Sequence, residues 1–286
     1  MKLNCQVVAA WLRDEARIPH SPRGQKLDLS KFELTWNDEF EGGSLDREKW
    51  LGHMGGRDNF REGARRRRGG YWCLDLARVE GGMLHIPTVY SGEGIAGGPP
   101  GYYTAGIDTR QAFRQKFGYF ETRCKLPKGK GQWSAFWMFN EMVYNIDGAG
   151  RDGTEIDIYE SPYYRHWLPL LKNAVTSNLH YDGYGKAQRM KNIGKFRVKD
   201  PYDSFHTYGL EWNENEYVFY IDGVESARSS FGGVSQNEQF LILSVEQAAN
   251  AWERLGWAGY IRRNKPGALT DFVVDYVRVY QYKELL

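Results

Sequence analysis

Hydrophobic and polar residues alternate in short runs along most of the chain, and turns rich in glycine separate the runs. A period of two places every second side chain on one face, which is typical of a β-strand with one buried face. Few stretches have helical periodicity. The pattern therefore predicts an all-β sandwich. The expected strands include residues 32–36, 83–86, 117–126 and 272–280, together with a hairpin of 206–212 and 217–223.

The first 31 residues are expected to form an N-terminal extension. Residues 4–17 have the pattern of a short helix packed on the outside, and residues 18–31 are polar and rich enough in proline and glycine to indicate a linker. The folded domain is predicted to begin near Phe32 and to occupy residues 32–286. One large all-β domain can accommodate that length.

Acidic residues cluster in the middle of the chain. They lie in the run Gly153-Thr154-Glu155-Ile156-Asp157-Ile158-Tyr159-Glu160. Its β-branched and aromatic residues favour a strand, on which Glu155 and Asp157 share one face and the two isoleucines the other. Regular alternation would place Tyr159 on the carboxylate face. A β-bulge inserts one residue and would return Glu160 to that face.

Three carboxylates on one strand face repel each other, so the cluster calls for a chemical explanation. Glycoside hydrolysis uses one ionised carboxylate and one protonated carboxylic acid, about 5 to 5.5 Å apart in retaining enzymes. A third acid between them can hold a proton and keep their pKa values apart. The alternatives are a solvated strand face and a calcium site made of acids.

Composition sets wider limits. The formal net charge is +2, which gives no general reason to expect nucleic acid or a membrane as partner. The three cysteines, Cys5, Cys73 and Cys124, have neither a disulfide framework nor metal-ligand spacing and are interpreted as buried thiols. No apolar run is long enough to span a membrane. The N-terminus is a poor signal peptide, so the chain is either cytosolic or lacks a natural leader.

At the acidic run the sequence resembles glycoside hydrolase family 16, the retaining β-jelly-roll endoglycanases. The family carries a Glu-x-Asp-x-x-Glu form with a bulge and a shorter form without it, and residues 155–160 look like the bulged form. The resemblance implies that Glu155 is the nucleophile, Asp157 the assisting acid and Glu160 the general acid/base. It also implies a jelly roll of two antiparallel sheets with a concave substrate cleft, in a family whose members are usually secreted.

Further motifs appear in the family's order over residues 32–282. They are an opening strand at 36–42, a strand ending in Leu-Pro at 117–127, the segment 131–138, a histidine-bearing strand at 178–181, the hairpin and the closing strand. In the segment 131–138, Ser134 stands where the family usually has proline.

Several residues are candidates for sugar binding. Trp133 and Trp137 are four apart and share a strand face, so they are either stacking platforms for pyranose rings or ordinary core. The family match places His180 near the substrate or the acid/base, the alternative being a structural histidine. Glu246 lies where a late cleft strand should run and is expected to bind a sugar hydroxyl.

Residues 61–68 contain five arginines, the last of which is Arg68. Such a run is usually a solvated loop. The functional alternative is recognition of sulfate or carboxylate on an acidic glycan by bidentate arginine contacts. The segment also departs from the laminarinase pattern, because it has no Asn-Asn-Glu-like sequence.

The hypothesis is a retaining endo-β-glycanase that acts on β-1,3- or mixed-linkage β-glucan. A galactan such as agar, porphyran or carrageenan is the alternative substrate, and a lectin-like carbohydrate-binding module is the alternative class. The expected partner is a polysaccharide or oligosaccharide, with no nucleic acid and no membrane, and the chain is expected to be a monomer. No cofactor is required. The resemblance also implies that a structural calcium ion can bind away from the cleft, and the sequence does not identify its ligands.

Overall fold

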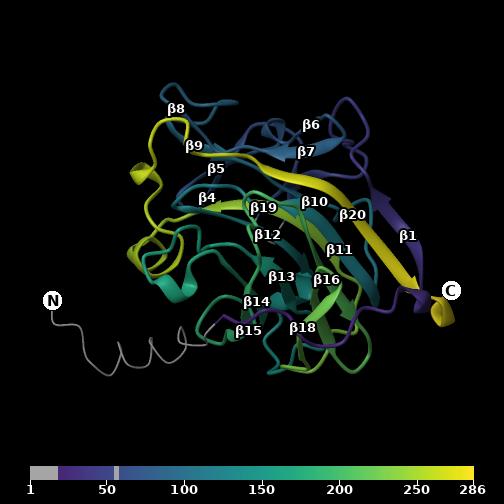
Figure 1. Ribbon diagram of the computed structural model, residues 1–286. Helices are drawn as coiled ribbons and strands as arrows, with labels where there is room; N and C mark the ends of the chain where they lie inside the picture. Colours follow the sequence, from purple (N-terminus) through teal and green to yellow (C-terminus); the bar gives the residue numbers. More distant parts are fainter. Residues whose placement is uncertain (1–18, 55–57) are drawn as a thin grey trace.

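The structure is a computed structural model that describes residues 19–54 and 58–286. The helix predicted over residues 4–17 and the thiol of Cys5 lie outside the described residues. Two large antiparallel sheets pack face to face as a jelly roll, as predicted, and short helical turns lie in the connections (Figure 1). The described part of the chain contains no helix long and apolar enough to cross a bilayer.

One sheet carries the acidic run and is called the cleft sheet here. All neighbouring strands in it are antiparallel. In spatial order its strands are β15 (Arg189–Arg197), β14 (Ala174–Tyr181), β13 (Glu155–Glu160), β12 (Gln132–Phe139), β19 (Phe240–Gln247), β10 (Gly106–Asp108), β2 (Leu51–His53) and β3 (Asn59–Phe60).

The second sheet is called the outer sheet. The long closing strand β20 runs through it and pairs along one edge with β11 and along the other with β7 and β1 (Figure 1). In spatial order its strands are β18 (Val224–Ser229), β17 (Tyr217–Ile221), β16 (His206–Trp212), β11 (Gly118–Lys125), β20 (Phe272–Tyr282), β7 (Met83–Ile86) and β6 (Arg78–Glu80), with β1 (Phe32–Asp38) beside β20.

A small third sheet and several helical turns complete the fold. The small sheet contains one parallel pair, β5 with β9. Its order is β4 (Ala64–Arg67), β5 (Gly70–Cys73), β9 (Gly101–Thr104) and β8 (Val89–Ser91). The turns are η1 (Leu29–Lys31), η2 (Leu74–Leu76), η3 (Glu141–Tyr144), η4 (Pro169–Leu171), η5 (Glu253–Trp257), η6 (Ile261–Arg263) and η7 (Lys283–Leu285).

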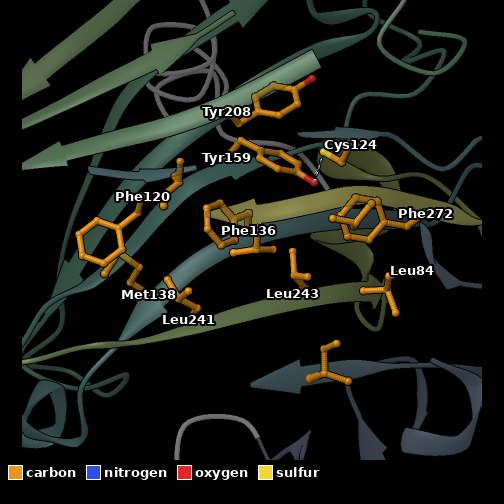
Figure 2. Packing of buried hydrophobic residues seen from close by; sticks show 14 of the residues in the cluster. Leu84, Phe120, Cys124, Phe136, Met138, Tyr159, Tyr208, Leu241, Leu243 and Phe272 are labelled. Atoms are coloured by element: carbon orange, nitrogen blue, oxygen red, sulfur yellow. Dashed lines mark hydrogen bonds between the residues drawn. The ribbon is translucent and has the colours of Figure 1, made fainter. Parts of the chain in front are cut away.

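The main core lies between the two large sheets. Side chains from β12 and β19, such as Phe136 and Leu243, meet those of β11 and β20 across the interface (Figure 2). Burial of this apolar surface is the dominant force that holds the sheets together. The thiols of Cys73 and Cys124 are buried, and Cys124 Sγ lies 3.3 Å from the hydroxyl of Tyr159.

Residues 19–31 lie along the edges of the two sheets. The backbone N–H of Arg197 donates to His20 O over 3.0 Å, and the N–H of Leu27 donates to Gly223 O over 2.8 Å. Isolated bridges join His20 to β15 and Lys26 to β18. The segment that composition indicates as a linker is therefore tied down by backbone hydrogen bonds, while the domain boundary near Phe32 stays a prediction.

Candidate active site

The bulge predicted for the acidic strand is present in β13. Asp157 pairs with Trp137 and Glu160 with Ala135, so two residues of β13 lie opposite Phe136 alone. The same shift separates Asp157 from Glu160 in the pairing with β14. The side chains of Ile158 and Tyr159 consequently both enter the main core. Glu160 returns to the face of Glu155 and Asp157, and all three carboxylates line one cleft.

The two glutamates have different hydrogen-bond partners. Glu160 accepts from Trp133 Nε1 over 3.0 Å and from Asn178 Nδ2 over 2.7 Å, so a neutral donor holds each of its oxygens. Glu155 Oε2 accepts from the hydroxyl of Tyr184. Its other oxygen, Oε1, lies 4.0 Å from Nε2 of His180.

His180 forms an ion pair with the central acid. Its Nε2 lies 3.2 Å from Asp157 Oδ2, and its Nδ1 lies 3.1 Å from the side-chain amide of Gln188. Burial disfavours the charged imidazole, but the hydrogen bond to Asp157 and the charges of the three acids outweigh burial and raise the pKa of His180 to about 9. A positive charge therefore sits among the carboxylates at neutral pH.

Burial raises the pKa of both glutamates above the ordinary carboxyl range, and the charge on Asp157 raises both further. His180 opposes the shift at each glutamate. The hydrogen bond from Tyr184 lowers the pKa of Glu155, whereas the charge of Glu155 raises the pKa of Glu160 further. The surroundings thus favour a proton on Glu160 and a charge on Glu155, which is the division of roles that glycoside hydrolysis needs.

The cleft consists of two adjoining hollows that meet at the acids. One, about 240 Å³, lies over β12 and β19, and the other, about 640 Å³, lies over β14 and β15. Residues that line both are Arg68, Trp133, Glu155, Asp157, Glu160 and Tyr184. An open cleft that continues on both sides of the acids suits a chain that is cut internally.

Trp133 and Trp137 both line the cleft, but little of either ring is exposed, 3% and 5% respectively. Trp137 Nε1 donates to Ser244 Oγ, and Trp133 donates to Glu160. Both therefore act as cleft floor and hydrogen-bond donors more than as open platforms. Tyr184 and Trp252, which also line the cleft, are far more exposed, at 45% and 50%.

The arginine run forms a hairpin whose two ends differ. Arg65 and Arg66 pack over Phe60 and Tyr71, away from the acids. Arg68 reaches the cleft, lies over the ring of Trp133 and pairs with Glu253. The segment predicted as a solvated loop thus contains strand β4 and leads into β5. Its last two arginines, Arg67 and Arg68, line the cleft.

Glu246 is buried and lines the smaller hollow. Its Oε1 accepts from Nε and Nη2 of Arg67 over 2.8 and 2.6 Å. Its Oε2 lies 3.7 Å from Arg68 Nε and has no hydrogen-bond partner among the described residues. A buried acceptor beside a cleft is costly unless a ligand or water satisfies it.

Cleft residues that were not among the candidates from the sequence include Arg67, Asn178, Tyr184 and Trp252. Asn178 is two residues before His180 on β14, so the period of two could have placed it on the same face. Tyr184 lies in a loop and Trp252 directly before the short helical turn η5, where a period of two does not apply. The departure at Ser134 also has a structural reason, because its backbone N–H donates to Ser161 Oγ over 3.0 Å and proline has no N–H.

Glu155, Asp157 and His180 bring potential metal-ligand atoms within 4.8 Å of one another. Histidine binds a metal as the neutral imidazole, whereas the acids around His180 favour its charged form. The set therefore fits a proton network better than a metal site. The calcium ion expected away from the cleft stays a prediction.

Comparison with known proteins identifies the family. The family model for the glycoside hydrolase family 16 domain of β-porphyranases A–D matches residues 33–282. The chain belongs to glycoside hydrolase family 16. It is an endo-β-glycanase, and the resemblance noted from the sequence is confirmed.

Proteins similar to this chain differ in the substrate that their names give. A glucan endo-1,3-β-glucosidase of Cryptopygus antarcticus is 33% identical over 86% of this chain and 90% of its own length. β-Porphyranase B of Zobellia galactanivorans is 26% identical over 86% and 82%. The crystal structure of SCLam, a non-specific endo-β-1,3(4)-glucanase, superposes with a TM-score of 0.69 at 26% identity and covers 93% of this chain and 97% of that one.

Proposed function

We propose that the protein is a retaining endo-β-glycanase in which Glu155 is the nucleophile, Glu160 the general acid/base and Asp157 the assisting acid. The observation that carries the proposal is the bulge in β13, which brings the three carboxylates to one face in unlike surroundings. Neutral donors hold Glu160, and a charged imidazole lies beside the other two acids.

In the first step Glu155 attacks the anomeric carbon while Glu160 gives its proton to the leaving oxygen. The charged His180 offsets the negative charge that Glu160 then acquires, and Asp157 pairs with His180 over 3.2 Å. In the second step the ionised Glu160 takes a proton from water, and the resulting nucleophile releases the sugar from Glu155. Both steps invert the anomeric centre, so its configuration is retained overall.

The substrate that we propose is β-1,3- or mixed-linkage β-glucan. The support is the substrate named for the Cryptopygus antarcticus relative and for SCLam. Glu246 Oε2 offers a buried acceptor for a sugar hydroxyl, and Arg68, Trp133 and Trp137 complete that wall of the smaller hollow.

Porphyran or a related sulfated galactan is the second candidate. The matching family model is that of porphyranases, and the hairpin brings Arg67 and Arg68 to the cleft. Against it, Glu246 and Glu253 already pair with these two guanidinium groups, which reduces the charge available to a sulfate.

The experiment is reducing-sugar release by the wild type and by Glu155→Ser on laminarin, barley mixed-linkage glucan, agarose, porphyran and carrageenan. Release from a glucan that the variant abolishes supports the first candidate, and release from porphyran alone supports the second. Full activity of Glu155→Ser would remove the assignment of the nucleophile. Binding to a polymer without release of reducing sugar from any polymer would support the lectin-like alternative.

A further inference from the structure

Tyr184 is an exposed residue that touches the centre of the cleft. Its side chain lines both hollows, and its hydroxyl donates to Glu155 Oε2. The residue lies beyond the end of β14, between Gly183 and Gly185, outside every strand that positions the acids. An exposed loop residue that contacts the nucleophile must be held by other contacts if it has a function there.

Backbone contacts hold the start of this loop. The N–H of Gly183, which has a φ of +70°, donates to Val143 O over 2.7 Å. The side chain of Asp182 accepts from the N–H groups of Asp147 and Gly148 over 3.3 and 3.2 Å. The loop is therefore attached to the segment that contains η3.

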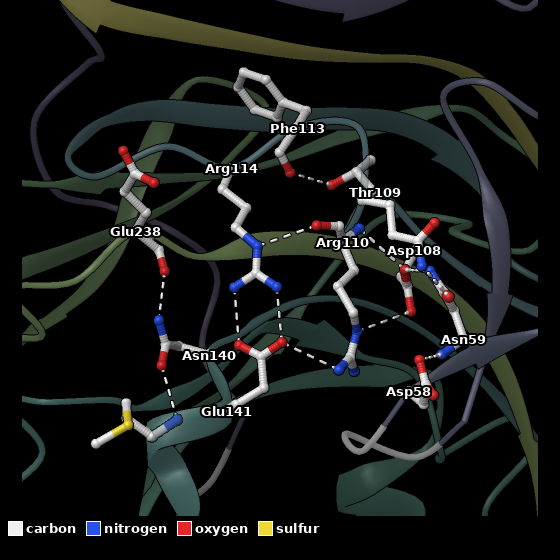
Figure 3. A network of polar contacts seen from close by, with 12 residues as sticks. Asp58, Asn59, Asp108, Thr109, Arg110, Phe113, Arg114, Asn140, Glu141 and Glu238 are labelled. Atoms are coloured by element: carbon white, nitrogen blue, oxygen red, sulfur yellow. Dashed lines mark hydrogen bonds and ion pairs between the residues drawn. The ribbon is translucent and has the colours of Figure 1, made fainter.

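The ring of Tyr184 packs on η3 itself. Its centroid lies 5.7 Å from that of Tyr144, in an edge-to-face arrangement. A bidentate ion pair fixes the start of η3, since Nη1 and Nη2 of Arg114 lie 2.8 and 2.7 Å from the oxygens of Glu141, and Arg110 Nη1 lies 3.1 Å from Oε1 (Figure 3). A polar network outside both hollows thus supports the ring that reaches Glu155.

We infer that Tyr184 is a positioning residue that anchors Oε2 of the nucleophile and leaves Oε1 to attack. The inference rests on the proposed role of Glu155. As the bond from Oε1 to the anomeric carbon forms, the bond from that carbon to the leaving oxygen breaks and Glu160 supplies the proton. Oε2 changes from a carboxylate oxygen to the carbonyl oxygen of the glycosyl ester and still accepts from Tyr184.

The hydrogen bond has a consequence for the pH dependence. A donor to a carboxylate binds the charged form more strongly than the neutral acid or the ester. Tyr184 thus stabilises Glu155 in its attacking state and as the leaving group of the second step. The other charged or titratable groups that face Glu155 are Asp157 and Glu160 on β13, His180 on β14, Arg67 on β4 and Arg68 directly after it, and Tyr184→Phe leaves all of them in place.

The test is the pH profile of kcat/KM for the wild type and Tyr184→Phe on the polymer that the wild type hydrolyses. The variant keeps the ring and removes only the donor. Loss of a hydrogen bond to a charged group should move the acid limb to higher pH by about one unit, with the alkaline limb unchanged. Tyr90→Phe is the control, because Tyr90 is an exposed tyrosine outside both hollows and its variant should retain the wild-type profile.

An unchanged acid limb in Tyr184→Phe would overturn the inference. If that variant does not fold by thermal melting, Arg114→Gln supplies a second test, since it loosens η3 without touching the cleft and should move the same limb in the same direction by a smaller amount. An inactive wild type, or an active Glu155→Ser, would instead show that the proposed function has failed.

Discussion

Glu121 in the outer sheet and Glu155 in the cleft sheet, the first buried and the second partly buried, each accept a hydrogen bond from a tyrosine hydroxyl and have a raised pKa. Glu121 on β11 accepts from Tyr119 over 2.9 Å and from Tyr276 over 3.3 Å, and burial raises its pKa as it does for Glu155. Glu121 lies on the side of the outer sheet away from the core, with Arg278 as its favourable charge. Glu155 shares its face with two further acids and opens onto the cleft.

The comparison separates the causes of a raised carboxyl pKa from the features that a catalytic carboxyl group needs. Burial and phenol donors are common to both sites, and a raised pKa alone therefore does not identify a catalytic acid. The site on β13 differs in having a second glutamate, a charged histidine and space for a substrate.

The largest expected difference is in turnover. Glu155→Gln removes the nucleophile and should reduce kcat by several orders of magnitude, because no covalent intermediate can form. Glu121→Gln keeps the shape of its side chain and should leave kcat within about threefold of the wild type, since the buried amide can still form hydrogen bonds with the two tyrosine hydroxyls. Kinetics of both variants on the same polymer check this, and equal losses would contradict the distinction.

The second difference is in the alkaline limb. Glu160 must carry a proton to act as an acid, so wild-type activity should fall as pH rises through its raised pKa. Glu160→Gln should lower turnover on the polymer by at least about a hundredfold and remove the alkaline limb from the remaining activity. Glu121→Gln should keep that limb. A pH profile of Glu160→Gln with the wild-type alkaline limb would assign the proton to another group.

A third, smaller difference is in stability. The folded-state pKa of Glu155 is raised, so its contribution is most favourable at low pH and is lost as pH rises from about 4.3 through the folded value. Glu155→Gln should therefore raise the unfolding free energy at pH 8 by about 1 to 3 kcal/mol and have little effect at pH 4. Thermal melting at the two pH values measures this, and a stabilisation that is equal at both would rule out titration as its cause.

The smallest expected effect concerns the exposed tryptophans. Trp252 lines the larger hollow, whereas Trp167, which is 64% exposed, lies outside both hollows and donates to Leu255 O. Loss of one aromatic contact is worth about 1 kcal/mol, so Trp252→Ala should raise KM for a polymer several-fold. Trp167→Ala should not. Equal KM values for the two variants would remove Trp252 from the path of the substrate.

The sequence predicts the strands and the acidic face because both follow from a period of two. The bulge was predictable for the same reason, since Glu160 is out of phase with Asp157 unless one residue is inserted. Trp133 and Trp137 were correctly placed on one face, but Trp133 is covered by Trp257 of η5 and by Arg68, and Trp137 packs on His53, contacts that alternation does not describe. Tyr184 comes from a loop whose path depends on distant contacts, such as the ion pair of Arg114 with Glu141, and Trp252 from the start of the short helical turn η5.

The bulge in β13 also bears on how this strand tolerates changes in length. The two residues opposite Phe136 both point into the core, so deletion of one would leave Glu155, Asp157 and Glu160 on alternate positions of a regular strand. The catalytic face would keep its three acids, and the loss would fall on the packing of Ile158 or Tyr159. A one-residue deletion at the bulge would therefore leave the three acids on the cleft face. In a regular strand, the same deletion would move every following side chain to the opposite face of the sheet.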